Sequence, residues 1–265
     1  MKNILVFVNF TEASASAVKQ ASALAKLHGG RLCICHVGDE AGEAGQKLRD
    51  YSAQAEETGV EVSILTGEGD FFKQAPLLTK AVAPDLVIVG ALGADGFSIR
   101  HFGSAIYKLV RSLPAATLIL QGNSPIHLRG FSNVMLPLSA HKNFKWVVES
   151  LPEVVAENCL VNILGVTGNG AGIDETLSLN AEAAKAELDR LGIKWNYSEV
   201  VIQKLSSGYA EVILAHMEKE GMDLIAMPAD VAKRSQHFGK MDKEALLSNG
   251  QGYPVLCVNT DTDRP

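Results

Sequence analysis

Four residues that together could bind a phosphate group lie within one stretch of the chain. Gly90, Gly93, Gly103 and Ser104 have the spacing G-x2-G-x9-G-S. Glycine lets backbone amides approach an anion closely and allows positive φ angles. A serine hydroxyl can cap a helix or donate to a phosphate oxygen. The first amides of a helix have no partner inside the helix, and the helix dipole favours an anion there. The spacing therefore predicts a phosphate-binding site.

The surrounding sequence predicts where this motif lies in the fold. Residues 85–90 form an apolar, buried-looking strand, and residues 104–112 have the pattern of a helix that begins at Ser104. Between them, Arg100 could supply a cation to a phosphate, and His101 could add a hydrogen bond. The alternative is that both are ordinary residues of a surface loop. In either case, the motif joins the end of a strand to the start of a helix.

Strands and helices alternate along the first half of the chain. The pattern predicts strands at residues 3–9, 31–37, 60–65, 85–90 and 116–120, and helices at 11–28, 43–58, 71–82 and 104–112. Continuous apolar strands separated by helices are typical of a parallel sheet that is covered on both faces. Right-handed crossovers then give a doubly wound α/β sheet of five strands.

The second half repeats this order. Apolar segments at 133–138, 223–228 and 254–258 lie 130, 138 and 138 positions after segments 3–8, 85–90 and 116–120. An internal duplication with an eight-residue insertion explains the offsets, and we place the insertion near residues 168–172. Turn residues at 122–126 separate the halves. We therefore predict two domains, 1–124 and 130–265, each a Rossmann-like, doubly wound five-stranded parallel sheet.

The composition restricts the class of protein. The chain has 265 residues and a net charge of −6, which argues against nucleic-acid binding because phosphate backbones require basic surfaces. No apolar run reaches the roughly 20 residues that span a bilayer, and no signal-peptide pattern is found. We expect a cytoplasmic protein with no membrane partner. The four cysteines lie in strand-like segments without a C-x-x-C pair, which predicts reduced, buried thiols.

The motif, placed after the fourth strand of such a unit, resembles the nucleotide-binding branch of the universal stress protein family. Pro114 before the strand at 116–120 and the opening segment at 4–14 also resemble that family. The resemblance covers the whole chain, closely in the first half and in outline in the second. It implies the adenine nucleotide alpha hydrolase-like fold, a tandem pair of domains related by a pseudo-twofold axis, and a regulatory role in stress response. Further association of two such chains stays open.

The resemblance also implies ATP, alone or with Mg²⁺, bound at the carboxyl ends of the strands. Gly90 and Gly93 would wrap the ribose and phosphates, while Gly103 and Ser104 would hold the phosphates. Arg100 is the candidate phosphate cation.

Two further residues complete the implied nucleotide site. Val37, which ends the second strand, would contact adenine through its backbone. Asn9 stands where the family usually has a carboxylate that helps to fix the nucleoside. Asparagine donates and accepts hydrogen bonds, but it is neutral and cannot form the charge-assisted bond of a carboxylate.

The motif is absent from the second half. An offset of 138 takes the four motif residues to Pro228, Val231, Met241 and Asp242. A carboxylate at the start of a helix would repel a phosphate. We therefore expect one nucleotide site in the first half and a structural role for the second.

Other classes of function remain open. A nucleotide-independent interaction protein with both pockets empty is favoured by Asn9 and by the altered second half. An NAD(P)-dependent oxidoreductase could use the glycine-rich stretch from Gly165 to Gly172, but this follows the second strand of its unit and lacks a downstream Tyr-x3-Lys pair. The sequence has no P-loop, nucleophile elbow or metal-binding histidine spacing, so we name no catalytic residue, and any ATP hydrolysis would be slow.

Overall fold

The computed structural model describes residues 2–90, 99–168, 173–202, 208–231 and 238–260, with only the backbone described at 99–102. The first half contains β1 (Asn3–Val8), α1 (Glu12–Leu27), β2 (Arg31–Val37), α2 (Glu43–Glu56), β3 (Glu61–Gly67), α3 (Phe71–Val82), β4 (Leu86–Gly90), α4 (Ile99–Ser112) and β5 (Ala116–Leu120). The second contains β6 (Phe131–Pro137), α5 (Lys145–Glu149), η1 (Leu151–Glu153), β7 (Val155–Gly168), α6 (Glu175–Leu191), β8 (Lys194–Ile202), α7 (Tyr209–Glu220), β9 (Leu224–Pro228), α8 (Lys240–Leu247) and β10 (Val255–Val258).

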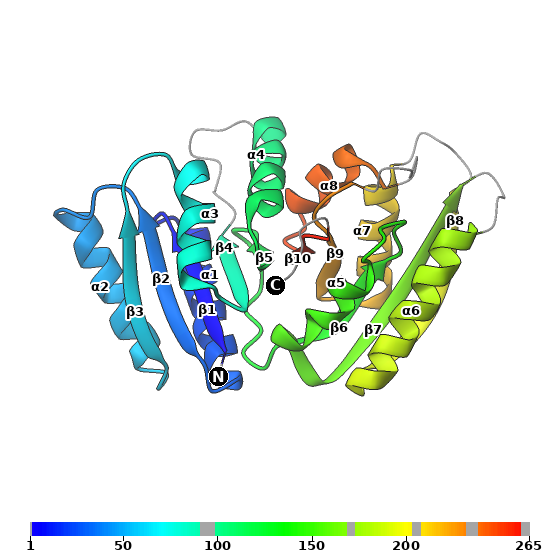
Figure 1. Ribbon diagram of the computed structural model, residues 1–265, viewed down its shortest axis with the longest axis horizontal. Coiled ribbons are helices and arrows are strands. Elements are labelled where there is room, and N and C mark those ends of the chain that lie inside the picture. Colours follow the sequence, from blue (N-terminus) through cyan, green and yellow to red (C-terminus); the bar gives the residue numbers. More distant parts are fainter. Residues whose placement is uncertain (1, 91–98, 169–172, 203–207, 232–237, 261–265) are drawn as a thin grey trace.

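All ten described strands form one sheet (Figure 1). Their order is β3-β2-β1-β4-β5-β10-β9-β6-β7-β8, and every neighbouring pair is parallel except β5 and β10, which are antiparallel. The predicted α/β fold with two five-stranded units is confirmed. Because β5 and β10 are the equivalent last strands of the two halves, their antiparallel pairing is the arrangement that a twofold axis produces.

Side-chain hydrogen bonds across the junction repeat this symmetry. Gln121 donates from Nε2 to the carbonyl of Leu247 at the end of α8, at 2.7 Å. Asn259, 138 positions after Gln121, donates from Nδ2 to the carbonyl of Arg111 at the end of α4, at 2.8 Å. Each half therefore uses the residue after its last strand to hold the other half's last helix.

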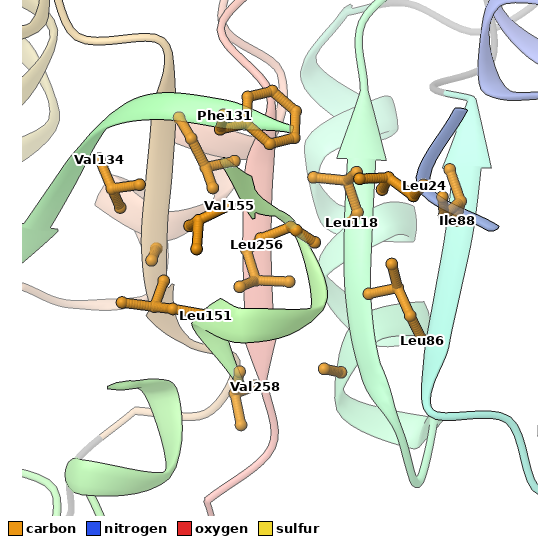
Figure 2. Packing of buried hydrophobic residues seen from close by; sticks show 14 of the residues in the cluster. Leu24, Leu86, Ile88, Leu118, Phe131, Val134, Leu151, Val155, Leu256 and Val258 are labelled. Atoms are coloured by element: carbon orange, nitrogen blue, oxygen red, sulfur yellow. The ribbon is translucent and has the colours of Figure 1, made fainter. Parts of the chain in front are cut away.

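Two hydrophobic layers cover the sheet. Side chains from α1, α2, α5 and α6 pack on one face, and side chains from α3, α4, α7 and α8 pack on the other. The first layer is continuous across the junction, where Leu118 of β5 pairs with Leu256 of β10 and lies near Phe131 (Figure 2). The halves thus share a core, which favours their folding as one body.

Local sequence signals begin and end the helices as expected. Thr11, Asp70 and Asp174 cap α1, α3 and α6 by accepting a hydrogen bond from a first-turn amide. Gly192 and Gly221 end α6 and α7 in the left-handed conformation. The start of α4 was predicted wrongly, because the helix begins at Ile99 rather than at Ser104.

The strand registers confirm the internal repeat and correct the position of its insertion. The pairs Ile4–Leu86 and Val134–Leu224 are equivalent, which gives the offsets of 130 and 138. The pairs Leu32–Val62 and Val161–Trp195 are equivalent too, so the offset is 129 at the second strand and 133 at the third. The offset therefore rises by four before the third strand and by five before the fourth. The extra residues fall in two places rather than only near 168–172.

The part of the chain described above has no membrane-spanning helix, no disulfide and no metal-binding cluster of side chains. No described helix is long and apolar enough to cross a membrane. No disulfide is formed among the described cysteines, and three of the four are buried. No group of three or more histidine, cysteine, aspartate or glutamate side chains there could hold a metal ion.

Candidate functional site

A pocket opens at the carboxyl ends of β1, β2 and β4, with a cavity volume of about 220 Å³. Three of the predicted residues, Asn9, Val37 and Gly90, line it although they come from three separate strands. The other lining residues are mostly apolar: Phe7, Val8, Phe71, Phe72, Val89, Ala105 and Ile106. Ligands of open parallel sheets bind at this edge, so the sequence placed these three residues at a pocket of the expected kind.

Gly90 is required here by its contact with α1. A Cβ on Gly90 would lie 2.4 Å from the carbonyl of Ala13 and 2.7 Å from the amide of Ser14. The end of β4 therefore passes against the first turn of α1 at a distance that no other residue allows. This close packing shapes one wall of the pocket.

Gly103 has a similar role in a different contact. It lies inside α4, and a Cβ there would be 2.7 Å from the carbonyl of Glu244 in α8. Gly103 therefore lets helices of the two halves pack closely. Ser104 follows it and is half-buried, but it does not line the pocket, whereas the next two residues, Ala105 and Ile106, do. Gly93 and the side chains of Arg100 and His101 lie outside the described residues.

The hydrogen bonds of Asn9 determine what it can offer a ligand. Its Oδ1 accepts hydrogen bonds from the Thr11 hydroxyl at 2.7 Å and the Thr11 amide at 3.4 Å. Thr11 in turn caps α1 through the amide of Ser14. Because a backbone N–H can only donate, these bonds fix the orientation of the Asn9 amide. Asn9 therefore keeps its NH₂ group for a ligand, where a carboxylate would present an acceptor.

Aromatic rings form the wall of the pocket that sequence analysis missed. Phe71 meets Phe7 edge-on with ring centroids 5.4 Å apart, and Phe72 packs against Phe71 at 5.5 Å. Phe72 is 41% exposed, which is high for a large apolar side chain. Such rings stack well on flat heterocycles. The available signal was the Phe71–Phe72 pair directly after the helix cap Asp70.

The equivalent place in the second half is filled by a lysine. Strand register takes Gly90 to Pro228, and the same offset of 138 takes Ala105 to Lys243. Lys243 is fully buried, and its ammonium donates to the carbonyl of Pro228 at 2.6 Å and to the carbonyl of Asp230. Burial lowers the pKa of Lys243 to about 8. A side chain thus occupies the space at the end of β9.

Further buried polar groups surround this lysine. His141 contacts the Ser139 hydroxyl through Nδ1 at 2.7 Å and the Asp230 carbonyl through Nε2 at 2.9 Å. Burial, aided by the charge of Lys243, lowers the pKa of His141 to about 4. The imidazole is therefore neutral at pH 7. It donates from Nε2, since a carbonyl can only accept, and it accepts from Ser139 at Nδ1.

The same group resembles a Ser–His–Asp triad in composition only. Asp230 Oδ2 lies 3.5 Å from His141 Nε2, while Oδ1 accepts from the Thr260 hydroxyl at 2.8 Å. Burial raises the pKa of Asp230, but His141 and the hydrogen bonds from Thr260 outweigh burial and hold it below its usual range. Ser139 is 2% exposed, so no substrate can reach its hydroxyl.

The glycine-rich stretch that begins at Gly165 follows β7, the second strand of its half, as expected. A Cβ on Gly165 would lie 2.7 Å from Cδ1 of Ile173. Residues 169–172 of this stretch, which includes Gly172, lie outside the described part of the chain.

A doubly wound sheet with a pocket at the carboxyl ends of its strands places the protein in the class of open α/β folds, whose ligands bind at this edge. Residues 1–121 match the sequence model of the universal stress protein family. The match to the universal stress protein family is thus a property of the first half of the chain, and residues after 121 lie outside it. No curated protein matches the chain significantly.

Solved structures extend the likeness to both halves. A universal stress protein from Archaeoglobus fulgidus is 14% identical, with a TM-score of 0.69 over 99% of this chain and 98% of that chain. A putative universal stress protein from Pseudomonas aeruginosa is 13% identical, with a TM-score of 0.66 over 98% of this chain and 94% of that one. A family protein from Arabidopsis thaliana with AMP bound is 15% identical, with a TM-score of 0.36 over 48% of this chain and 99% of that one. At these identities, the two full-length matches show that the whole chain shares their fold.

Proposed function

We propose that the chain binds an adenine nucleotide, ATP alone or with Mg²⁺, in the pocket of its first half and acts as a cytoplasmic regulatory protein of stress response. One observation carries the proposal: Asn9, Val37 and Gly90 line a single pocket at the sheet edge where open α/β proteins bind ligands. The match of residues 1–121 to the universal stress protein family supports it.

The chemistry of the pocket fits a nucleoside better than a polar metabolite. Phe71 and Phe72 offer aromatic surface for a base, and Asn9 offers hydrogen-bond donors at the rim. The phosphates would extend toward α4, which contains Arg100, Gly103 and Ser104 of the motif region; Gly93 precedes this helix in the sequence. The proposal includes binding and no catalytic step.

The second half has a structural role in this proposal. Its equivalent pocket holds the buried side chain of Lys243, and α8 packs against α4 of the first half. Residues 1–124 would carry the nucleotide site, and residues 130–265 would support it. The choice between one tandem chain and a further assembly of chains stays open.

Calorimetric titration with ATP and AMP tests nucleotide binding. Gly103 is a poor position for the test variant, because any side chain there would collide with α8. Ala105→Leu instead adds volume at the pocket wall, and Ala53→Leu on the exposed face of α2 is a matched control. Binding by the wild type and the control, with loss in Ala105→Leu, supports the proposal. A wild type that binds neither nucleotide at millimolar concentration would refute it and favour a nucleotide-independent interaction protein.

Asn9→Asp tests the orientation of the nucleoside. A carboxylate can accept both Thr11 hydrogen bonds and still present an acceptor to the ligand. A charge-assisted bond is stronger than a neutral one, so we expect ATP affinity to rise about tenfold. Unchanged affinity would show that the nucleoside does not contact residue 9.

A further inference from the structure

A second cavity lies on the opposite face of the sheet from the nucleotide pocket, among α1, α2 and the segment that joins the two halves. Its volume is about 680 Å³. Its apolar lining comes from Val18, Ala23 and Leu27 of α1, Ala55 of α2, and Ile126 and Leu128 of the joining segment. We call it the α1–α2 groove. Neither the family motif nor the proposed nucleotide site involves these residues.

Large apolar side chains at the groove are exposed to water. Leu128 is 72% exposed and Leu27 is 45% exposed. Grouped exposure of this kind is typical of a surface that a partner covers. The groove hydroxyls are already hydrogen-bonded, because Ser22 donates to the Val18 carbonyl of α1 and Thr58 to the Ala55 carbonyl of α2.

The charged residues of the groove are all cations. Lys19, Lys26 and Arg129 line it, and no acidic residue does, although the chain has a net charge of −6. Within the described residues, these three cations form no ion pair, whereas lysines elsewhere, such as Lys47 and Lys145, pair with glutamates one turn away. The groove therefore has unneutralised positive charge beside apolar surface.

The spacing of the cations selects the kind of occupant. Lys19 and Lys26 are seven residues apart on α1, so they lie on one helix face about 10 Å apart at the usual rise of 1.5 Å per residue. One carboxylate or phosphate headgroup contacts cations only within about 4 Å. To engage both lysines, such a headgroup would require the two long side chains to converge on one point. Carboxylates seven residues apart on a second helix have the matching separation.

We propose that the α1–α2 groove binds an acidic amphipathic helix of a partner protein. The apolar face of that helix would pack on Leu27, Ile126 and Leu128, in the helix-in-groove mode of recognition. Its flanking carboxylates would pair with Lys19 and Lys26 of α1. This proposal is independent of nucleotide binding, because the groove and the nucleotide pocket share no lining residue.

Peptide selection on the full-length chain tests the proposal. A displayed library of helical 16-residue peptides is selected on the immobilised wild type, and enriched peptides are measured by fluorescence anisotropy. We expect peptides with apolar residues at helical spacing and with acidic residues seven positions apart. Absence of enrichment, or enrichment of basic peptides, would overturn the proposal.

Matched variants then locate the binding site. The double variant Lys19→Glu/Lys26→Glu turns two attractive contacts into repulsive ones, so the affinity of the enriched peptide should fall at least about tenfold. Its charge-matched control is Lys80→Glu/Lys108→Glu, at exposed lysines of α3 and α4. An equal loss in both double variants would overturn the proposal.

Apolar contact and ligand class are tested in the same assay. Leu128→Ser should weaken peptide binding, whereas Leu77→Ser, at a leucine of α3 that is 61% exposed, should not. Equal effects of these two changes would count against the groove.

Oleate is the competing single-headgroup probe. Saturable oleate binding that depends on Lys19 and Lys26, without peptide binding, would overturn the proposal and show that the groove binds a lipid anion.

Discussion

The buried His141 makes acid stability the sharpest prediction from this structure. Its side chain is almost fully buried, and its pKa is lowered from 6.5 to about 4, chiefly by burial. The unfolded chain therefore binds a proton at this histidine near pH 6.5, whereas the native chain binds it only near pH 4. The contribution of the neutral imidazole to the free energy of unfolding is fully present above pH 6.5 and is lost as the pH falls toward 4.

The magnitude follows from the pKa difference. A pKa that falls from 6.5 to about 4 corresponds to about 3.5 kcal/mol, at roughly 1.4 kcal/mol for each tenfold change in proton affinity, and most of this is lost by pH 4.5. Asp230 does not obscure this window, because its pKa is held below 3.8 and its contribution disappears only in stronger acid. His127, whose pKa burial also lowers, adds in the same direction.

Urea unfolding between pH 7.5 and 4.5, followed by circular dichroism, measures the effect. In His141→Gln, the amide can still donate to Asp230 and accept from Ser139, but it does not titrate. We expect this variant to be less stable than the wild type at pH 7.5 and to lose about 2.5 kcal/mol less on acidification. His216→Gln on α7 is the control. If His141→Gln loses as much stability as the wild type, His141 is not the titrating group.

Three further predictions concern the second half and its junction. Gly103→Ala should lower the free energy of unfolding by about 1–3 kcal/mol in urea titrations, because the new methyl group meets the carbonyl of Glu244. Gly122→Ala, which has no atom within 4 Å of the added methyl group, should leave stability nearly unchanged, and equal losses would contradict the argument. The pKa of Lys243 is lowered from 10.5 to about 8, so between these pH values the unfolded chain binds more protons than the native chain, and the stability of the wild type should rise with pH. The free energy of unfolding of the wild type should therefore increase relative to that of Lys243→Met from pH 8 to 10. A constant difference between the two proteins would exclude this titration. Gln121→Ala leaves a buried carbonyl of α8 without its donor and should cost about 1–3 kcal/mol by the same measurement, and an unchanged midpoint would show that the bond does not stabilise the junction.

The order of elements could be predicted because it depends on local sequence. Apolar runs such as residues 85–90, and caps such as Thr11 and Asp70, are visible within a few residues of the chain. The offset of 138 was also visible, because the fourth and fifth strands keep their apolar pattern in both halves. The predicted position of the insertion was wrong. The glycine-rich residues 168–172 suggested that all of the extra residues lie there, whereas the registers of β7 and β8 show that they fall in two places.

Contacts between distant residues could not be predicted in this way. Gly103 follows a loop and precedes a serine, which is typical of an anion site, but its space requirement comes from Glu244 in the other half. Lys243 stands between Asp242 and Glu244, a pattern typical of a solvated helix surface, yet it is fully buried. Of the candidate site, the three residues at strand ends were placed by topology. Phe71 and Phe72 required knowledge of how α3 packs.

The two halves, whose last strands β5 and β10 pair antiparallel, are parts of one chain, and this covalent connection permits them to differ. In a dimer of identical chains, any change that filled one pocket would fill both, because symmetry copies every substitution. Covalent linkage removes that constraint and keeps the halves at a high effective concentration, so neither half needs a site of its own to retain its partner. The buried Lys243 in one half and the open pocket in the other are a difference that a symmetric dimer of identical chains could not have.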